Sequence, residues 1–373
     1  MATAEGVINI FSTPEHRSEA EERWVSFQPY LLSKGYRLRA RYQPDWVPSW
    51  KEDDVDALDC EDSVDCRPVR VIDAVRIEDG RRVMIKMIIR PQQGRKGLKE
   101  LELLRHFSTA PIKDDPSNHV VPCLDSFPIP DADGCFVVMP LLGRYKYPSF
   151  FNFAEVHDFL QQIFEASWVA GLIFLHNHSV AHCDIASNNI MMDASTLYTE
   201  PIHPFHYQFS FDMRRRLHPK YIRSQVRIRY YYIDLGYAKW FKEPSAGQKV
   251  LADPARLMAP EQIPGSPYDP FLGDVFQLGA VIRRDLSQEV PGLRFLEPLT
   301  RKMTYPEPSK RPLLKEAQAS MNTAFLGLSG WTYRRPFIPK GSRFKDYYRL
   351  VLIGVLAELE YWMKRFLNLL KLV

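Results

Sequence analysis

The chain has 373 residues, of which 45% are hydrophobic and 25% charged, and its formal net charge is +4. This composition is ordinary for a globular protein and argues against wholesale disorder, while the weak charge gives no reason to expect a nucleic-acid partner. Five scattered cysteines without a C-x-x-C pair favour reduced thiols, and the first residues lack the apolar run of a secretory signal. We therefore expect a cytoplasmic or nuclear protein, and a monomer.

Residues 1–60 have the pattern of an extension wrapped on the rest of the protein. A helix is predicted with Thr13 as its cap and Pro14 at its first position, because proline fits the first turn of a helix. An extended aromatic piece follows. The acidic run "KEDDVDALDCEDSVD", residues 51–65, is expected to be a solvated loop.

Residues 61–142 predict a small sheet with one helix. The β-rich runs "VRVIDAVRI" and "RRVMIKMII" flank a tight turn that contains Gly80, which is typical of a hairpin. "GLKELELLRHF" has the pattern of a helix, and "CFVVMPLL" that of a short buried strand.

Residues 143–330 are predominantly helical in pattern, with helices predicted at 153–178, 273–286 and 313–326. An insertion at about 194–226 contains "MRRRLHPKYIR", the densest basic cluster of the chain. A strand-rich part followed by a helix-rich part predicts an α+β protein of two lobes with a cleft between them.

Residues 331–373 predict an amphipathic helical tail. Charges at Glu358, Glu360, Lys364 and Arg365 interrupt it well before the roughly 18 uncharged residues that a membrane span needs. We expect the apolar stripe to lie on the protein's own body; a partner or membrane-surface contact and a tail anchor are the alternatives. The stripe consists of Tyr348, Leu352, Val355, Leu359, Trp362, Phe366 and Leu369.

Several side chains have the order that phosphoryl transfer requires, which is a cation for the triphosphate, oxygen ligands for Mg²⁺ and a base for the acceptor hydroxyl. Lys86 lies on the second strand of the predicted hairpin. Glu100, on the following helix, is expected to pair with Lys86, and Glu102 is the alternative partner. In "HCDIASNN", Asp184 is a candidate base and Asn189 a metal ligand. "YYYIDLG" delivers Asp234 from a buried strand as a second metal ligand.

Each of these residues also has a simpler interpretation, in which Lys86 and Glu100 are solvated surface charges. His176, His178, His182 and Cys183 raise the possibility of zinc, but their position at a helix end and loop fits the phosphoryl-transfer pattern better. The histidines of the insertion are expected to be solvated rather than metal ligands; they are His203, His206 and His218.

With these motifs in this order, residues 64–325 resemble a eukaryotic protein kinase. The chain is similar in particular to kinase-like proteins of mushroom-forming fungi, through "LRARYQPDWVPSW" and "VRIRYYYIDLG". The resemblance implies a bilobal fold with a small β-rich N-lobe (61–142) and a larger α-helical C-lobe (143–330), binding of ATP and Mg²⁺, and a protein substrate. The matching residues are Lys86, Glu100, His182-Cys183-Asp184, Asn189, Asp234-Leu235-Gly236, Ala259-Pro260-Glu261, Asp274 and Arg311, the last paired with Glu261. Val71, Met139 and the N–H of Leu142 correspond to the adenine pocket.

Four departures from the family pattern bear on catalysis. The phosphate loop "VDCRPVR" contains no glycine, although glycines let backbone N–H groups approach phosphate. Ala186 stands where serine/threonine kinases place a lysine, and Pro254 replaces the threonine that bonds that lysine. Tyrosine kinases also have alanine at the first position but supply an arginine two residues later, where this chain has Asn188. Cys183 replaces an arginine that receives an activation-loop phosphate, so we expect no phosphorylation switch at Ser245.

The fourth departure is the insertion. Its arginines, Arg214, Arg215 and Arg216, are either solvated or available to dock an acidic substrate or to supply the missing cation. The sequence therefore predicts an ATP-dependent protein kinase. A pseudokinase that acts as a nucleotide-binding or scaffolding module is the alternative, and a small-molecule phosphotransferase is a third reading.

Overall fold

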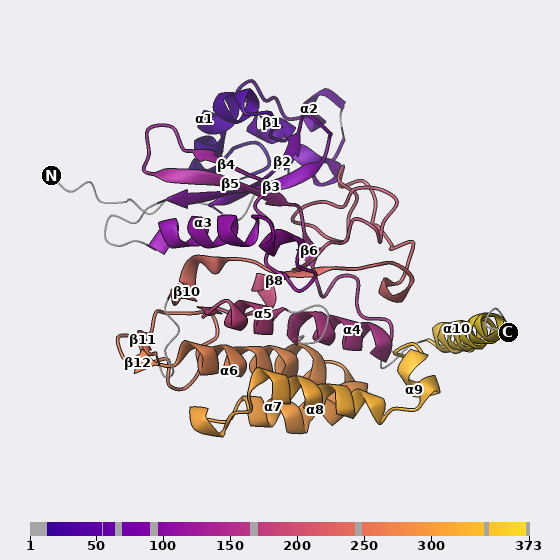
Figure 1. The fold of residues 1–373 in the computed structure, drawn as a ribbon. Coiled ribbons are helices and arrows are strands. Elements are labelled where there is room, and N and C mark those ends of the chain that lie inside the picture. The colour runs from indigo at the N-terminus through magenta and orange to yellow at the C-terminus, as the bar shows by residue number, and fades with distance from the viewer. Residues whose placement is uncertain are drawn as a thin grey trace. The chain divides into compact units, whose positions relative to one another are not determined.

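The computed structural model describes residues 13–53, 55–63, 69–89, 96–164, 171–242, 248–338 and 343–370 (Figure 1). The protein is mixed α+β and divides into two compact units. The first unit comprises Met1–Lys113, Val121–Tyr147 and Met192–Lys220. The second comprises Asp114–Val120, Pro148–Met191 and Tyr221–Val373. The chain therefore crosses between the units several times.

The first unit is built on a five-stranded antiparallel sheet in the order β1-β2-β3-β5-β4. The predicted hairpin is confirmed, because β2 and β3 pair around Gly80, whose φ of +70° suits glycine. The predicted buried strand is β5. The strands are β1 (Tyr36–Arg37), β2 (Val71–Arg76), β3 (Arg82–Ile89), β4 (Asp125–Pro128) and β5 (Gly134–Pro140), with β6 (Gly143–Arg144) after them.

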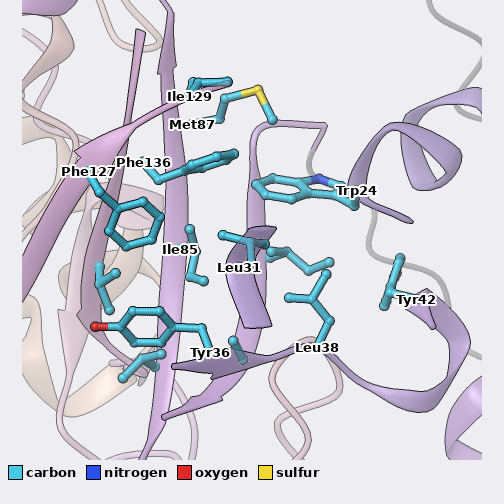
Figure 2. Close-up of a cluster of buried hydrophobic side chains, with 14 of the residues drawn as sticks. Trp24, Leu31, Tyr36, Leu38, Tyr42, Ile85, Met87, Phe127, Ile129 and Phe136 are labelled. Atoms are coloured by element: carbon cyan, nitrogen blue, oxygen red, sulfur yellow. The ribbon is translucent and has the colours of Figure 1, made fainter. Parts of the chain in front are cut away.

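Helix α1 (Glu19–Ser33) covers one face of this sheet, and the predicted helix α3 (Lys96–Phe107) lies on the other (Figure 1). Trp24 and Leu31 of α1 pack against Ile85 and Phe136 of the sheet, and the Trp24 and Phe136 ring centroids are 5.9 Å apart (Figure 2). These side chains alternate along their strands with residues on the opposite face, as the two-residue period of a strand requires.

The predicted start of α1 is wrong. Ser18, not Thr13, is the cap, because its hydroxyl accepts from the Glu21 N–H while the Glu21 carboxylate accepts from the Ser18 N–H. Thr13 instead exchanges backbone hydrogen bonds with His16. The reciprocal pair satisfies two helix-end donors, which a cap at Thr13 without a matching acid does not.

The acidic segment is also more ordered than predicted. Between residues 50 and 63 the chain forms α2 (Trp50–Asp53) and two short 3₁₀ turns, Ala57–Asp59 and Glu61–Ser63. Asp62 is buried and accepts hydrogen bonds from Trp46 and Ser49, which hold the pKa of its carboxyl below the usual value even though burial raises it. Glu61 pairs with Arg39 at 2.5 Å. Burial of these acids is tolerated because donors satisfy them.

Most of the insertion belongs to the first unit. Phe205 packs against the buried cluster of Figure 2, and the Arg82 guanidinium lies 3.3 Å from the centre of the Phe211 ring. Arg215 pairs with Glu200, and Arg216 donates to Gln208, while all three arginines of the cluster remain exposed. The basic cluster is therefore partly engaged within its own segment.

The second unit is mainly helical, and α4 contacts α5 and α8, while α7 contacts α6 and α8 (Figure 1). The helices predicted at 273–286 and 313–326 are present as α6 and α8, and the ends of the helix predicted at 153–178 are present as α4 and α5, while residues 165–170 lie outside the described ranges. The helices are α4 (Phe153–Phe164), α5 (Leu172–Asn177), α6 (Pro270–Ile282), α7 (Glu297–Met303), α8 (Leu314–Leu326), α9 (Gly330–Arg334) and α10 (Phe344–Leu370). The short strands are β7 (Val180–Ala181), β8 (Ile190–Met192), β9 (Tyr230–Tyr232), β10 (Lys239–Trp240), β11 (Val250–Leu251) and β12 (Pro267–Tyr268).

Helix α10 contacts α9 and the residues after it through a face other than the predicted stripe. Glu358 forms an ion pair with Arg334 at 2.6 Å, and Gly354 lies against Pro336. The described members of the stripe are instead exposed, with Leu359 at 61% and Phe366 at 62%, so the expectation that the stripe packs on the protein is wrong. Among the described residues, no helix has the length and apolar character to cross a membrane.

Candidate active site

The loop of residues 182–189 joins β7 to β8, and side chains of α6 hold it through hydrogen bonds. Asp274 of α6 is fully buried, and its carboxylate accepts from the backbone N–H of His182 at 2.8 Å and of Cys183 at 2.7 Å. The same carboxylate is 2.9 Å from Nε2 of His176. A buried carboxylate with several donors is a strong anchor, so α6 fixes the start of the loop.

A second side chain of α6 holds the next peptide units. Gln277 accepts from the Ile185 N–H at 2.7 Å and donates to the Cys183 carbonyl at 3.1 Å. These bonds hold Cys183 at a φ of +64°, which is uncommon for a residue other than glycine. Burial raises the pKa of the Cys183 thiol, so this sulfur is a packed neutral group rather than a reactive thiolate.

Asp184 and Asn189 are joined directly. The Asn189 amide donates to the Asp184 carbonyl and to its carboxylate Oδ2, both at 2.8 Å, and each residue is 1% exposed. Nδ1 of His182 accepts from the Asp184 N–H at 3.3 Å, so Nε2 carries the proton and donates to the Ile233 carbonyl at 3.1 Å. The candidate base is thus oriented by its own loop.

Strand β9 delivers Asp234 to the same place. The Ile233 N–H donates to the Asn189 carbonyl at 3.0 Å, which ties the strand end to the loop. Asp234 itself has a φ of +64°, and its side chain is 28% exposed. Because of this left-handed conformation, the chain leaves the direction of β9 at Asp234, and the Asp234 carboxylate stays accessible.

Arg256 brings the three predicted residues of this unit together. Its backbone N–H donates to Asp184 Oδ1 at 2.8 Å, and its Nη1 donates to Asn189 Oδ1 at 3.0 Å. Its Nη2 is 3.8 Å from Asp234 Oδ2. The sequence reasoning missed this residue, although Pro254, two positions before it, was singled out.

The first unit holds the remaining predicted site residues. Lys86 Nζ is 2.5 Å from Glu100 Oε1, so the predicted pairing of strand lysine and helix acid is present. Val71 is the register partner of Lys86, and Met139 is that of Met84, which places Val71, Lys86 and Met139 on one face of the sheet. That face is opposite to the one shown packed in Figure 2. Leu142, just after β5, is buried.

A buried ion pair supports the segment that carries Arg256. Arg311 makes two bonds to the Glu261 carboxylate, at 2.6 and 2.7 Å, and the Arg311 side chain is 0% exposed. A bidentate pair of this kind gives both geometry and energy. Glu261 and Arg311 are therefore structural residues of the second unit.

Some predictions fall outside the described residues or on groups with another role. Residues 64–68 of the glycine-free loop and Ser245 lie outside the described ranges. His203 is buried rather than solvated, and burial lowers its pKa to about 3. Within the described ranges, no three or more His, Cys, Asp or Glu side chains are grouped to hold a metal ion.

No protein-family model matches the chain, and no curated protein matches it in sequence. What the site can do therefore rests on its own residues. Asp234 and Asn189 offer two oxygen ligands, which suits Mg²⁺ because this ion is usually held by one or two side chains together with water and phosphate oxygens. Asp184 offers a fixed carboxylate beside them.

Proposed function

We propose that the chain is an ATP- and Mg²⁺-dependent protein kinase that transfers the γ-phosphoryl group to a protein hydroxyl. The observation that carries the proposal is the convergence of Asp184, Asn189 and Asp234 around one guanidinium, with Asp274 fixing the loop that carries the first two. A cluster of oxygens already arranged around a positive group is the kind of environment that a magnesium-bound phosphate needs. The Lys86–Glu100 pair supplies independent support.

Each side chain has one role in this proposal. Lys86, held by Glu100, binds phosphate oxygens of ATP, and Val71, Met139 and Leu142 surround the adenine. Asn189 and Asp234 would hold Mg²⁺, and the ion would supply positive charge to neutralise the phosphates.

Asp184 orients the acceptor hydroxyl and takes its proton. Its Oδ1 already accepts from the Arg256 N–H and its Oδ2 from Asn189, so its orientation does not depend on the substrate. The proposal includes the bilobal kinase fold, a monomer, and a cytoplasmic or nuclear location.

Phosphate transfer from labelled ATP tests the proposal directly. The purified full chain, with Mg²⁺ and a generic protein acceptor, is compared with Asp184→Asn and Lys86→Met. We expect each substitution to lower transfer by about 100-fold or more, because each removes a group needed in the transition state. Lys302→Met, an exposed lysine of α7, is the matched control and should transfer like the parent. Equal transfer by all four proteins would reject the proposal.

A pseudokinase is the second candidate, and one observation favours it. The Arg256 guanidinium donates to Asn189 Oδ1, the same oxygen that the kinase proposal assigns to Mg²⁺. Ala186 adds to this reading, because the loop carries no lysine there. Binding of ATP by the parent without any transfer to protein would support a nucleotide-binding or scaffolding module.

A further inference from the structure

The loop of residues 182–189 has one acid, Asp184, and two amides, Asn188 and Asn189, but no basic side chain other than that of His182. A phosphoryl group in transfer spreads negative charge over its oxygens, and a nearby cation stabilises that charge. Position 186 is alanine and position 188 asparagine, so the loop itself does not provide this cation. Another segment of the chain has to supply it if the site transfers phosphate.

The backbone of Arg256 is held in place, whereas its guanidinium is accessible. Its backbone N–H is bonded to Asp184 Oδ1 at 2.8 Å, so the residue is positioned by the candidate base. Its guanidinium reaches Asn189 Oδ1 at 3.0 Å, while its distances to the carboxylates of Asp184 and Asp234 are 4.0 and 3.8 Å. The side chain is 51% exposed, so a ligand can reach it.

The two arginines of this region are held very differently. Arg311 is 0% exposed and makes two short bonds to Glu261, which leaves its guanidinium committed to that acid. Arg256 approaches its two carboxylates at distances beyond a normal hydrogen bond, and half-exposed ion pairs of this kind are weak. Its guanidinium can therefore change partners, and its planar fork of donors matches the oxygens of a phosphate.

We propose that Arg256 is the cation that binds the terminal phosphate of ATP, in the place of the lysine that the loop lacks. The inference rests on the proposed function and names the residue that completes its site. Asn189 and Asp234 would hold Mg²⁺, and the guanidinium would then pair with the γ-phosphate instead of with these two side chains. As the bond from the γ-phosphorus to the bridging oxygen breaks and the bond to the acceptor oxygen forms, Arg256 offsets the charge, the acceptor proton goes to Asp184, and ADP leaves.

Affinities for MgATP and MgADP test the inference, because only ATP has the phosphate that Arg256 would bind. Dissociation constants are measured by calorimetry on the full chain, for the parent, Arg256→Ala and Arg256→Lys. We expect Arg256→Ala to weaken MgATP about 10-fold or more and MgADP less than twofold, since one charge-assisted contact is lost. Arg256→Lys should regain part of the ATP affinity, because it keeps the charge but not the fork.

Arg301→Ala is the matched control, since Arg301 is an exposed arginine of α7 paired with Glu297. It should change neither affinity. In the transfer assay, Arg256→Ala should lower kcat about 100-fold or more and raise KM for ATP in line with the weaker binding, and added guanidinium ion should restore part of the rate.

The failure of the inference and that of the proposed function give different results. Equal losses of ATP and ADP affinity in Arg256→Ala, or tighter binding of ATP, would overturn the inference, and tighter binding would mean that Arg256 keeps the metal out. A parent that binds ATP but transfers nothing refutes the kinase, yet the ATP-to-ADP comparison still decides the role of Arg256. A parent that binds neither nucleotide overturns both.

Discussion

The loop of residues 182–189 and helix α10 differ in the kind of side chain that each exposes to water. The loop buries polar groups, such as Asp184 and Asn189, and bonds them to one another and to α6. Helix α10 exposes large apolar groups, such as Leu359 and Trp362, along one stripe. In the loop, the chain satisfies the costly groups itself, and this is what gives the loop a single conformation. In the stripe, no part of the described chain covers the apolar surface.

This difference indicates which regions have a conformation that is fixed by contacts within the chain. A buried carboxylate without donors is so unfavourable that the Asp274 contacts allow few alternatives for the loop. An exposed leucine costs far less, so the stripe does little to fix the orientation of α10. Substitutions in the two regions should therefore have very different effects on stability.

The largest effect is expected for Asp274→Ala. It leaves the N–H groups of His182 and Cys183 without their acceptor, so the free energy of unfolding should fall by about 3–5 kcal/mol. Asp269→Ala is the matched control, because it removes only the cap of the same helix and should cost about 1 kcal/mol. Urea unfolding measures both. Similar losses for the two variants would contradict the view that Asp274 anchors the loop.

A pH dependence should follow from His119, whose carbonyl accepts from the Tyr232 N–H of β9. Burial lowers the pKa of His119 to about 4, below the 6.5 of an exposed histidine. Between these values the unfolded chain binds the extra proton, so stability rises with pH there and is lost as the pH falls from about 6.5 towards 4. The loss is at most about 1.4 kcal/mol per pH unit.

Unfolding at pH 7 and pH 5 measures this effect. We expect the stability difference between the two pH values to be smaller by roughly 2 kcal/mol in His119→Gln than in the parent. His203→Gln, at the other strongly shifted histidine, should reduce the difference in the same direction. An unchanged difference in His119→Gln would show that His119 is protonated as easily in the folded protein as in the unfolded chain.

The smallest effect is expected on the stripe. Leu359→Ala should change the free energy of unfolding by less than about 0.5 kcal/mol, whereas Leu278→Ala in α6, where the leucine is fully buried, should cost about 2–5 kcal/mol. Thermal unfolding at several protein concentrations measures both. A large, concentration-dependent loss for Leu359→Ala would mean that a second copy of the chain covers the stripe.

The sequence predicted elements that follow from short-range pattern. The hairpin of β2 and β3 follows from β-branched residues in alternation around a glycine turn, and the structure has it with Lys86 beside Val71. The pairing of Lys86 with Glu100 followed from the order of motifs. Such features depend on neighbours in the chain, and a single sequence contains that information.

Features that depend on distant partners could not be predicted. The cap of α1 is an exception, because Ser18 and Glu21 lie three residues apart and their reciprocal bond is a short-range signal that the sequence itself carries. Asp62 looked solvated because its donors, Trp46 and Ser49, become its neighbours only in the fold. Arg256 escaped notice for the same reason, since its place beside Asp184 depends on the path of the segment between β9 and α6.

The first sixty residues have a practical consequence for anyone who trims this chain. A fragment starting at residue 61 would keep Lys86, Asp184 and Asp234. It would also lose Trp24, Leu31 and strand β1, and so expose an aromatic sheet surface together with an unpaired strand edge. We expect such a fragment to be insoluble, and its inactivity would say nothing about catalysis.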